Sequence, residues 1–135
     1  MTNVATVQDI YDAFGKGDVP RILGHLSDNV AWEHGAGTND VPWLQSRAGK
    51  EGAAAFLASL ADLQFERFEP KTFLESKDLV VVLLDVEATV RSTGMPIKEE
   101  DQVHLWTFGK DGKVERFRHR VDTLKHQRAC KPDSV

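Results

Sequence analysis

The stretch LVVVLLDVEATVRSTGMPIKEEDQVHLWTFGKDGKVERFRHRVDTL, residues 79–124, decides the fold of this chain. It contains three runs rich in β-branched and aromatic residues, a composition typical of strands, and a fourth such run precedes it. The four predicted strands cover residues 65–74, 79–90, 97–108 and 114–124. Turn-forming residues separate them at 76–78, 92–94 and 110–112. We therefore predict three successive hairpins, which make an antiparallel meander.

The residues before the meander favour helices. Apolar residues recur at the spacing of one helix face in the first segment, at Val7, Ile10, Tyr11 and Phe14. Asn3 is the candidate cap of this helix, and Asp18 is the candidate cap of a short second helix that should end near Ser27. A short strand is expected from Val30, and helical spacing returns over residues 53–61. This order of elements predicts an α+β fold.

A long loop is predicted over residues 35–48, which show no period and are rich in Gly, Asn, Asp and Pro. Long irregular connections in compact domains are often lids or binding loops. A large indole on such a loop, Trp43, should cover an apolar surface. We expect the loop to close the mouth of a pocket, with Trp43 outside the main core.

Composition limits the class of protein. The chain has 135 residues, of which 41% are hydrophobic and 28% charged, as in an ordinary globular protein. We expect one domain over residues 1–125 and a polar, frayed tail over residues 126–135. A net charge of −4 argues against a nucleic-acid partner, and no segment is apolar enough to predict a membrane span or an export signal. With a single cysteine, Cys130, we expect a cytoplasmic protein.

Three segments carry a resemblance to the nuclear transport factor 2-like superfamily, which includes ketosteroid isomerase, limonene epoxide hydrolase and the SnoaL-like polyketide cyclases. They are FGKGDVPRILGHLSDNVAWEHGAG at 14–37, GKEGAAAFLASL at 49–60 and FGKDGKVERFRHRVD at 108–122. The resemblance implies a cone-shaped fold in which three N-terminal helices pack on a curved, mostly antiparallel sheet and leave an apolar pocket. Because this fold carries many reactions, the resemblance does not name one.

Compared with ketosteroid isomerase, the chain lacks the expected carboxylates. The general base of that enzyme corresponds to His34 and its protonated oxyanion-hole acid to His104. Its oxyanion-hole tyrosine corresponds to Ile10, one residue from Tyr11. Steroid isomerisation by the same residues is therefore not expected.

Compared with limonene epoxide hydrolase, the chain offers an incomplete set of catalytic residues. The strand predicted over residues 79–90 has Asp85 and Glu87 but no arginine at the matching position. Asp122 corresponds to the carboxylate on the last strand of that enzyme. The remaining pattern is the SnoaL-like one, with a polar group on the first strand and a histidine or aspartate on the last strands.

The candidate catalytic residues are His34, His104, His119 and Asp122. The three histidines alternate with apolar neighbours along their strands, which predicts that they point into buried space. A neutral imidazole suits general acid–base chemistry, and Asp122 is a candidate to orient one. The alternative is that the histidines are hydrogen-bonded core residues and that Asp122 is a surface acid. His25 and His126 are expected to be exposed.

The chain has no pattern typical of a metal or cofactor site. We find no metal-ligand spacing among the histidines and acids, and no phosphate-loop or dinucleotide signature, so we expect neither a metal nor another cofactor. The aromatic residues predicted to line the pocket and contact a ligand are Phe14, Trp32, Trp43, Phe56, Trp106 and Phe117. The alternative is that most of them only pack in the core, and Trp43 is the one that favours a ligand or partner contact.

Two functions remain open from the sequence. The first is a cofactor-independent isomerase, cyclase or hydratase that acts on a small hydrophobic carbonyl or polyketide-like compound, with His34 as base, His104 polarising an oxygen and Asp122 or His119 in support. The second is a non-catalytic small-molecule-binding or dimerisation module. Val103, Leu105 and Thr107 make the second face of their strand partly apolar, so we also expect a homodimer through the sheet.

Overall fold

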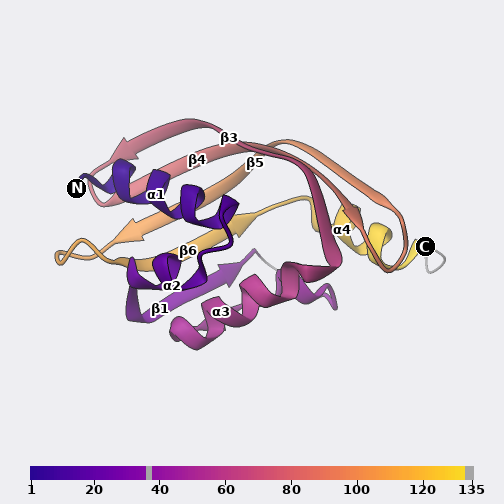
Figure 1. The fold of residues 1–135 in the computed structure, drawn as a ribbon, viewed down its shortest axis with the longest axis horizontal. Coiled ribbons are helices and arrows are strands. Elements are labelled where there is room, and N and C mark those ends of the chain that lie inside the picture. The colour runs from indigo at the N-terminus through magenta and orange to yellow at the C-terminus, as the bar shows by residue number, and fades with distance from the viewer. Residues whose placement is uncertain (36–37, 133–135) are drawn as a thin grey trace.

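The computed structural model describes residues 1–35 and 38–132. Helices lie on one face of a single curved sheet (Figure 1). The helices are α1 (Asn3–Gly15), α2 (Val19–Gly24), α3 (Gly49–Ser59) and α4 (Thr123–Cys130), with short 3-10 turns at Pro42–Leu44 and Leu60–Asp62. The α+β class and the three N-terminal helices are as predicted, and α4 is an additional helix.

Within residues 1–35 and 38–132, the sheet has six strands in the order β2-β1-β6-β5-β4-β3. Their bounds are β1 (Leu26–His34), β2 (Arg47–Ala48), β3 (Leu63–Ser76), β4 (Leu79–Val90), β5 (Pro96–Phe108) and β6 (Val114–Arg120). The predicted meander of β3 to β6 is confirmed, and each of its turns contains one residue with positive φ: Lys77, Gly94 or Gly112. The parallel pairing of β1 with β6 joins the N-terminal part of the chain to the meander.

Capping residues fix where the first helices begin. The Thr2 side chain, rather than the predicted Asn3, accepts the first-turn hydrogen bond of α1 from the Ala5 backbone N–H. Asp18 caps α2 as predicted, and Pro20 lies in the first turn, where its missing N–H costs little. The second helix ends at Gly24 rather than near Ser27, and β1 begins at Leu26, earlier than expected.

The core lies between the helices and the inner face of the sheet. Alternate residues of β4 and β5 are fully buried there, including Val80, Val82 and Trp106. The opposite residues on the outer face, such as Leu83 and Leu105, are only half-buried. Within the described residues, no helix has the length and apolar character needed to cross a membrane.

The expectation of a frayed tail is wrong for residues 126–130, which belong to α4, and residues 133–135 of that tail lie outside the described residues. The last strand stops at Arg120, and the Asp122 side chain caps α4 by accepting from the Lys125 backbone N–H. His126, predicted to be exposed, is only 4% exposed. The helix is polar overall, so its apolar content alone gave no sign that one of its residues reaches the core. His25, also predicted to be exposed, is partly buried and bonds to Asp9.

The expectation that Trp43 lies outside the main core is also wrong. Of the predicted loop, residues 36–37 lie outside the described residues, while Pro42–Leu44 form a 3-10 turn and Arg47–Ala48 form β2. Trp43 is 1% exposed and its indole Nε1 donates to His126 Nδ1 at 2.9 Å. It is a core residue rather than the contact of an external lid.

We expect Trp43→Ala to lower the free energy of unfolding by about 3 kcal/mol or more, because it removes a fully buried aromatic side chain and leaves a cavity. Urea unfolding followed by circular dichroism measures this loss. The control Leu124→Ala changes a side chain that is 50% exposed and should alter stability by less than about 1 kcal/mol. If both variants lose equally little, Trp43 does not belong to the core.

We propose that a second copy of the chain covers the outer face of the sheet. Val103 and Leu105 are half-buried there, and the neighbouring Arg118 has a buried Nε without a partner among the described residues. An isologous contact would cover the apolar strip and offer this guanidinium an acceptor. Analytical ultracentrifugation should show a dimer that Leu105→Glu dissociates and Leu124→Glu leaves intact. A monomeric wild-type chain at micromolar concentration would refute the proposal.

Candidate functional site

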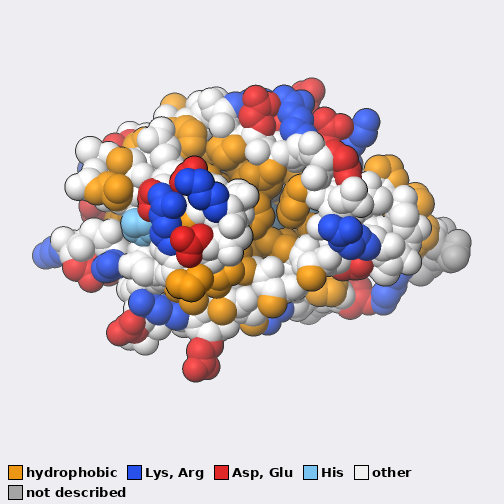
Figure 2. Space-filling view, in the orientation of Figure 1, with side chains coloured by type: hydrophobic (Ala, Val, Ile, Leu, Met, Phe, Trp, Pro, Cys, Tyr) orange, Lys and Arg blue, Asp and Glu red, His pale blue; other side chains and the backbone are white. Residues whose placement is uncertain are grey.

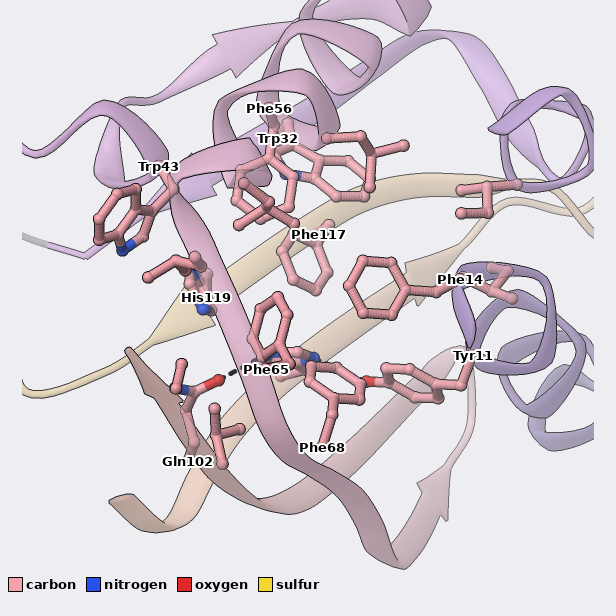
Figure 3. A pocket seen from close by; sticks show the side chains of 18 of the residues that line it. Tyr11, Phe14, Trp32, Trp43, Phe56, Phe65, Phe68, Gln102, Phe117 and His119 are labelled. Atoms are coloured by element: carbon pink, nitrogen blue, oxygen red, sulfur yellow. Dashed lines mark hydrogen bonds between the residues drawn. The ribbon is translucent and has the colours of Figure 1, made fainter. Parts of the chain in front are cut away.

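A cavity opens between the helices and the inner face of the sheet. Its empty volume is about 710 Å³, including solvent space at its mouth, and Figure 2 shows a hollow lined by hydrophobic side chains on this side of the molecule. All the aromatic residues predicted for the pocket lie in its wall: Phe14, Trp32, Trp43, Phe56, Trp106 and Phe117. Figure 3 labels five of them, all except Trp106. The wall is therefore largely aromatic.

The aromatic wall is built around Phe117 of β6. Its ring centroid lies 4.3 Å from that of Trp32 on β1 and 4.4 Å from that of Trp106 on β5. The strand register explains this cluster, because Trp32 and Trp106 are the direct partners of Phe117 on the two neighbouring strands. Side chains of paired residues point to the same face of a sheet. Such a wall suits a flat, largely apolar ligand.

The three predicted histidines form a row across the same three strands. His34 on β1 pairs with His119 on β6, which pairs with His104 on β5. The ring centroids of His34 and His119 are 6.0 Å apart, and those of His119 and His104 are 5.1 Å apart. All three side chains are buried, as predicted from their alternation. The row brings the three predicted histidines together.

The row does not give all three histidines access to the cavity. His104 and His119 line it, whereas His34 is not among the lining residues and contacts Thr123 Oγ1 at 3.2 Å through Nε2. Desolvation lowers the pKa of His34 below its ordinary value, and nearby positive charge adds to the effect. The structure thus offers no direct route from His34 to a ligand, and the role of base that we assigned to it has no support from the geometry.

His104 is held by hydrogen bonds on both ring nitrogens. Nδ1 lies 2.7 Å from the Tyr11 hydroxyl, which accepts from Trp106 Nε1 at 3.0 Å, and Nε2 lies 3.3 Å from Gln102 Oε1. Burial lowers the pKa of His104 to about 3, so the ring is neutral at physiological pH. Because Gln102 Oε1 can only accept, His104 carries its proton on Nε2, and Tyr11 donates to Nδ1.

Tyr11, Gln102 and His104 form a polar wall of the cavity. The carboxylate of Glu99 extends this polar wall and is buried, with its side chain 7% exposed. Its Oε1 accepts from Gln102 Nε2 at 3.3 Å and from His126 Nε2, and its Oε2 accepts from the Asp122 backbone N–H at 3.0 Å. Burial alone would raise the pKa of Glu99, but the bonds from His126 and Asp122 outweigh it and hold the pKa below its ordinary value. Glu99 is therefore an ionised carboxylate inside the protein.

His119 differs from the other lining histidines because its Nδ1 is buried without a hydrogen-bond partner among the described residues. Desolvation lowers its pKa well below the ordinary value, with the neighbouring histidines adding to the effect. A buried polar atom without a partner in the protein is unusual, and it leaves this nitrogen available to a bound ligand. His119 is thus the histidine of the cavity wall with uncommitted hydrogen-bonding capacity.

The carboxylates singled out from the sequence lie away from the cavity. Asp122 caps α4 and borders a separate surface hollow beside Met95 and Leu124. Asp85 forms ion pairs with Lys71 and Arg67 outside the cavity wall. Within residues 1–35 and 38–132, no group of three His, Cys, Asp or Glu side chains is arranged to hold a metal ion.

Sequence reasoning missed Tyr11, Gln102 and His126 as residues of the cavity wall, and Glu99 behind them. Tyr11 was one residue from the position compared with the oxyanion-hole tyrosine, and its place in the apolar stripe of the first helix was the available signal. Glu99 lies in the run EEDQ, which reads as exposed. Only the cap at Asp122, which starts a helix, could have indicated that His126 returns to the core.

We expect acid to destabilise the fold through its buried neutral histidines. The pKa values of His104 and His119 are lowered in the fold, so below about pH 6.5 the unfolded chain binds protons that the folded chain does not. Their contribution to stability is complete above this pH and is lost as pH falls, by up to about 1.4 kcal/mol per pH unit for each group. Urea unfolding at pH 7 and pH 5 measures the loss. His104→Gln should remove about one proton from the uptake on unfolding, so the free energy of unfolding should change less steeply with pH. Equal stability at the two pH values would contradict the expectation.

Several solved structures are similar to the whole chain. An NTF2-like protein of unknown function from Burkholderia pseudomallei is 28% identical, with a TM-score of 0.83 and coverage of 97% of this chain and 99% of that chain. An NTF2-like protein from Burkholderia xenovorans is 27% identical, with a TM-score of 0.83 and 94% coverage of both chains. TerC, co-crystallised with polyporic acid, is 29% identical, with a TM-score of 0.79 and coverage of 94% and 96%. No curated protein matched.

The solved structures share the fold of this chain, and a sequence profile identifies its family. The helices on a curved, mostly antiparallel sheet are those of the NTF2-like neighbours. The sequence profile of the SnoaL-like domain matches residues 7–117, which include the aromatic wall up to Phe117. The chain belongs to the SnoaL-like domain family, within the nuclear transport factor 2-like superfamily.

Proposed function

We propose that the protein binds a small, hydrophobic, ring-containing carbonyl compound in the aromatic cavity and transfers a proton on it without a cofactor, with His119 as the acid–base group. The observation that carries this proposal is the unpartnered Nδ1 of His119, a buried residue of the cavity wall. The aromatic wall around Phe117 supports a flat ligand. The ligand of TerC, polyporic acid, supports the same class of compound.

The environment of His119 suits a base that acts on a bound substrate. Its pKa is lowered because the imidazolium form is poorly solvated. When the ring takes a proton from carbon next to a carbonyl, the enolate that forms lies beside the imidazolium, and their attraction offsets this penalty. The same proton can return to another atom of the enolate, which gives an isomerisation, or drive a ring closure.

His104 differs from His119 in what it can contribute. Both of its nitrogens are engaged, with Tyr11 and Gln102, so it has no free nitrogen with which to take a proton from a ligand. Its ring lies 5.1 Å from that of His119, where it packs against the base and helps to fix its orientation. We therefore assign proton transfer to His119 rather than to the pair of His34 and His104.

A second candidate is a non-catalytic binding module. Burial lowers the pKa values of His34, His104 and His119 together, which favours neutral rings that simply pack in the core. In that case the cavity would bind hydrophobic compounds without changing them. Proton exchange on a bound ketone distinguishes the two functions.

We expect the wild-type protein to accelerate hydrogen–deuterium exchange at the α-carbon of β-tetralone, a fused-ring ketone, because this exchange requires proton transfer only. Proton NMR in deuterium oxide measures the rate. His119→Ala should reduce the enzyme-dependent rate at least about 100-fold, the range of a general base. The matched control Glu115→Ala changes an exposed residue of the same strand that does not line the cavity, and it should retain the rate.

Isothermal titration calorimetry with polyporic acid tests whether the cavity binds a compound of this class. Binding that depends on Phe117 and His119 but is accompanied by no exchange on any ketone would favour the binding module. Exchange that persists in His119→Ala would remove His119 from the role of base. His119→Gln, which keeps a polar side chain of similar size, guards against loss of folding.

A further inference from the structure

The hydrogen bonds of the polar wall all run in one direction, toward Glu99. Trp106 donates to Tyr11, Tyr11 donates to His104, and His104 donates to Gln102, whose amide donates to Glu99. From the other side, Trp43 donates to His126, which donates to Glu99. The carboxylate is thus the common end point of two chains of donors.

This direction depends on the negative charge of Glu99. If the Gln102 amide turned over, its carbonyl oxygen would face the carboxylate, and two acceptors would be in contact without a proton between them. The turned amide would also present N–H to His104 Nε2 and force the ring proton to Nδ1. An ionised, buried carboxylate makes that arrangement costly, because charge-assisted hydrogen bonds are the stronger ones and unpaired buried acceptors are penalised.

We propose that Glu99 is a positioning residue, which acts through Gln102 to keep His104 in the Nε2-protonated form and to direct the Tyr11 hydroxyl proton to His104 Nδ1. The consequence for a ligand concerns Tyr11. Its one proton is committed to His104, so toward the cavity its oxygen acts as an acceptor and cannot donate to a ligand oxyanion. The site therefore favours a ligand that presents a hydroxyl group to Tyr11.

Only this consequence for the ligand rests on the proposed function. The position of the proton on His104 belongs to the unliganded protein, so it can be measured whether or not the chain proves to be an enzyme. A structural role for Glu99, which fastens α4 through His126 and Asp122, would leave that proton in place.

Nitrogen-15 NMR of histidine side chains tests the proposal, because protonated and unprotonated ring nitrogens give distinct signals. The wild-type protein should show His104 with its proton on Nε2. Gln102→Leu breaks the chain between Glu99 and His104 while leaving the bonds from His126 and Asp122 to Glu99. This variant should move the His104 proton to Nδ1, where it can donate to the Tyr11 oxygen.

Glu99→Gln should also shift His104 toward the Nδ1-protonated form, and Glu100→Gln, a change at the exposed neighbouring residue, should not. The indole N–H signal of Trp43 reports whether α4 stays docked in each variant. The proposal fails if wild-type His104 is protonated on Nδ1, or if Gln102→Leu keeps the Nε2 proton with α4 in place. Deuterium exchange on β-tetralone is recorded separately and decides the proposed function alone.

Discussion

The buried carboxylate of Glu99 is the constraint on which the polar part of the cavity depends. An ionised group inside a protein has to be neutralised by donors, and here these come from β5, from α4 and from the backbone at Asp122. Two of these donors, Gln102 and His126, each accept from a further donor, so the orientation of one side chain propagates to Trp43 on one side and to Tyr11 on the other. Strand β5, helix α4 and helix α1 are thereby joined by a single network.

The apolar part of the cavity follows a different rule, in which strand register alone brings the groups together. Trp32, Phe117 and Trp106 are neighbours because β1, β6 and β5 are paired at those residues. Two residues further along β1 and β6, and two residues earlier along β5, the same pairing places His34, His119 and His104 in a second row. An aromatic row and a histidine row lie next to each other on one face. His119 lies between two imidazoles and near the aromatic row, which explains why its charged form is disfavoured.

The sequence predicted the elements whose signals are local. The hairpins have turn residues such as Gly94 and Gly112, and α2 has its cap at Asp18. These signals depend on residues a few positions apart, so the sequence pattern and turn chemistry are enough to predict the elements. The histidines were recognised as buried from alternation alone. The network around Glu99 joins residues up to 95 positions apart, as in the bond from Trp106 to Tyr11, and no local pattern encodes such pairs. Similarly, His126 reaches the core only because α4 turns back toward β5.

The parallel pairing of β1 with β6 has a consequence for how the chain folds. The meander of β3 to β6 consists of contacts between sequence neighbours and can form early, since local contacts cost little loop entropy. The contact of β1 with β6 closes a loop that spans most of the chain and can form only after the last strand exists. The rows of histidine and aromatic side chains cross this same boundary, so the cavity wall is incomplete until β1 pairs with β6. A chain in which only the meander has formed therefore has most of its sheet but lacks the complete cavity.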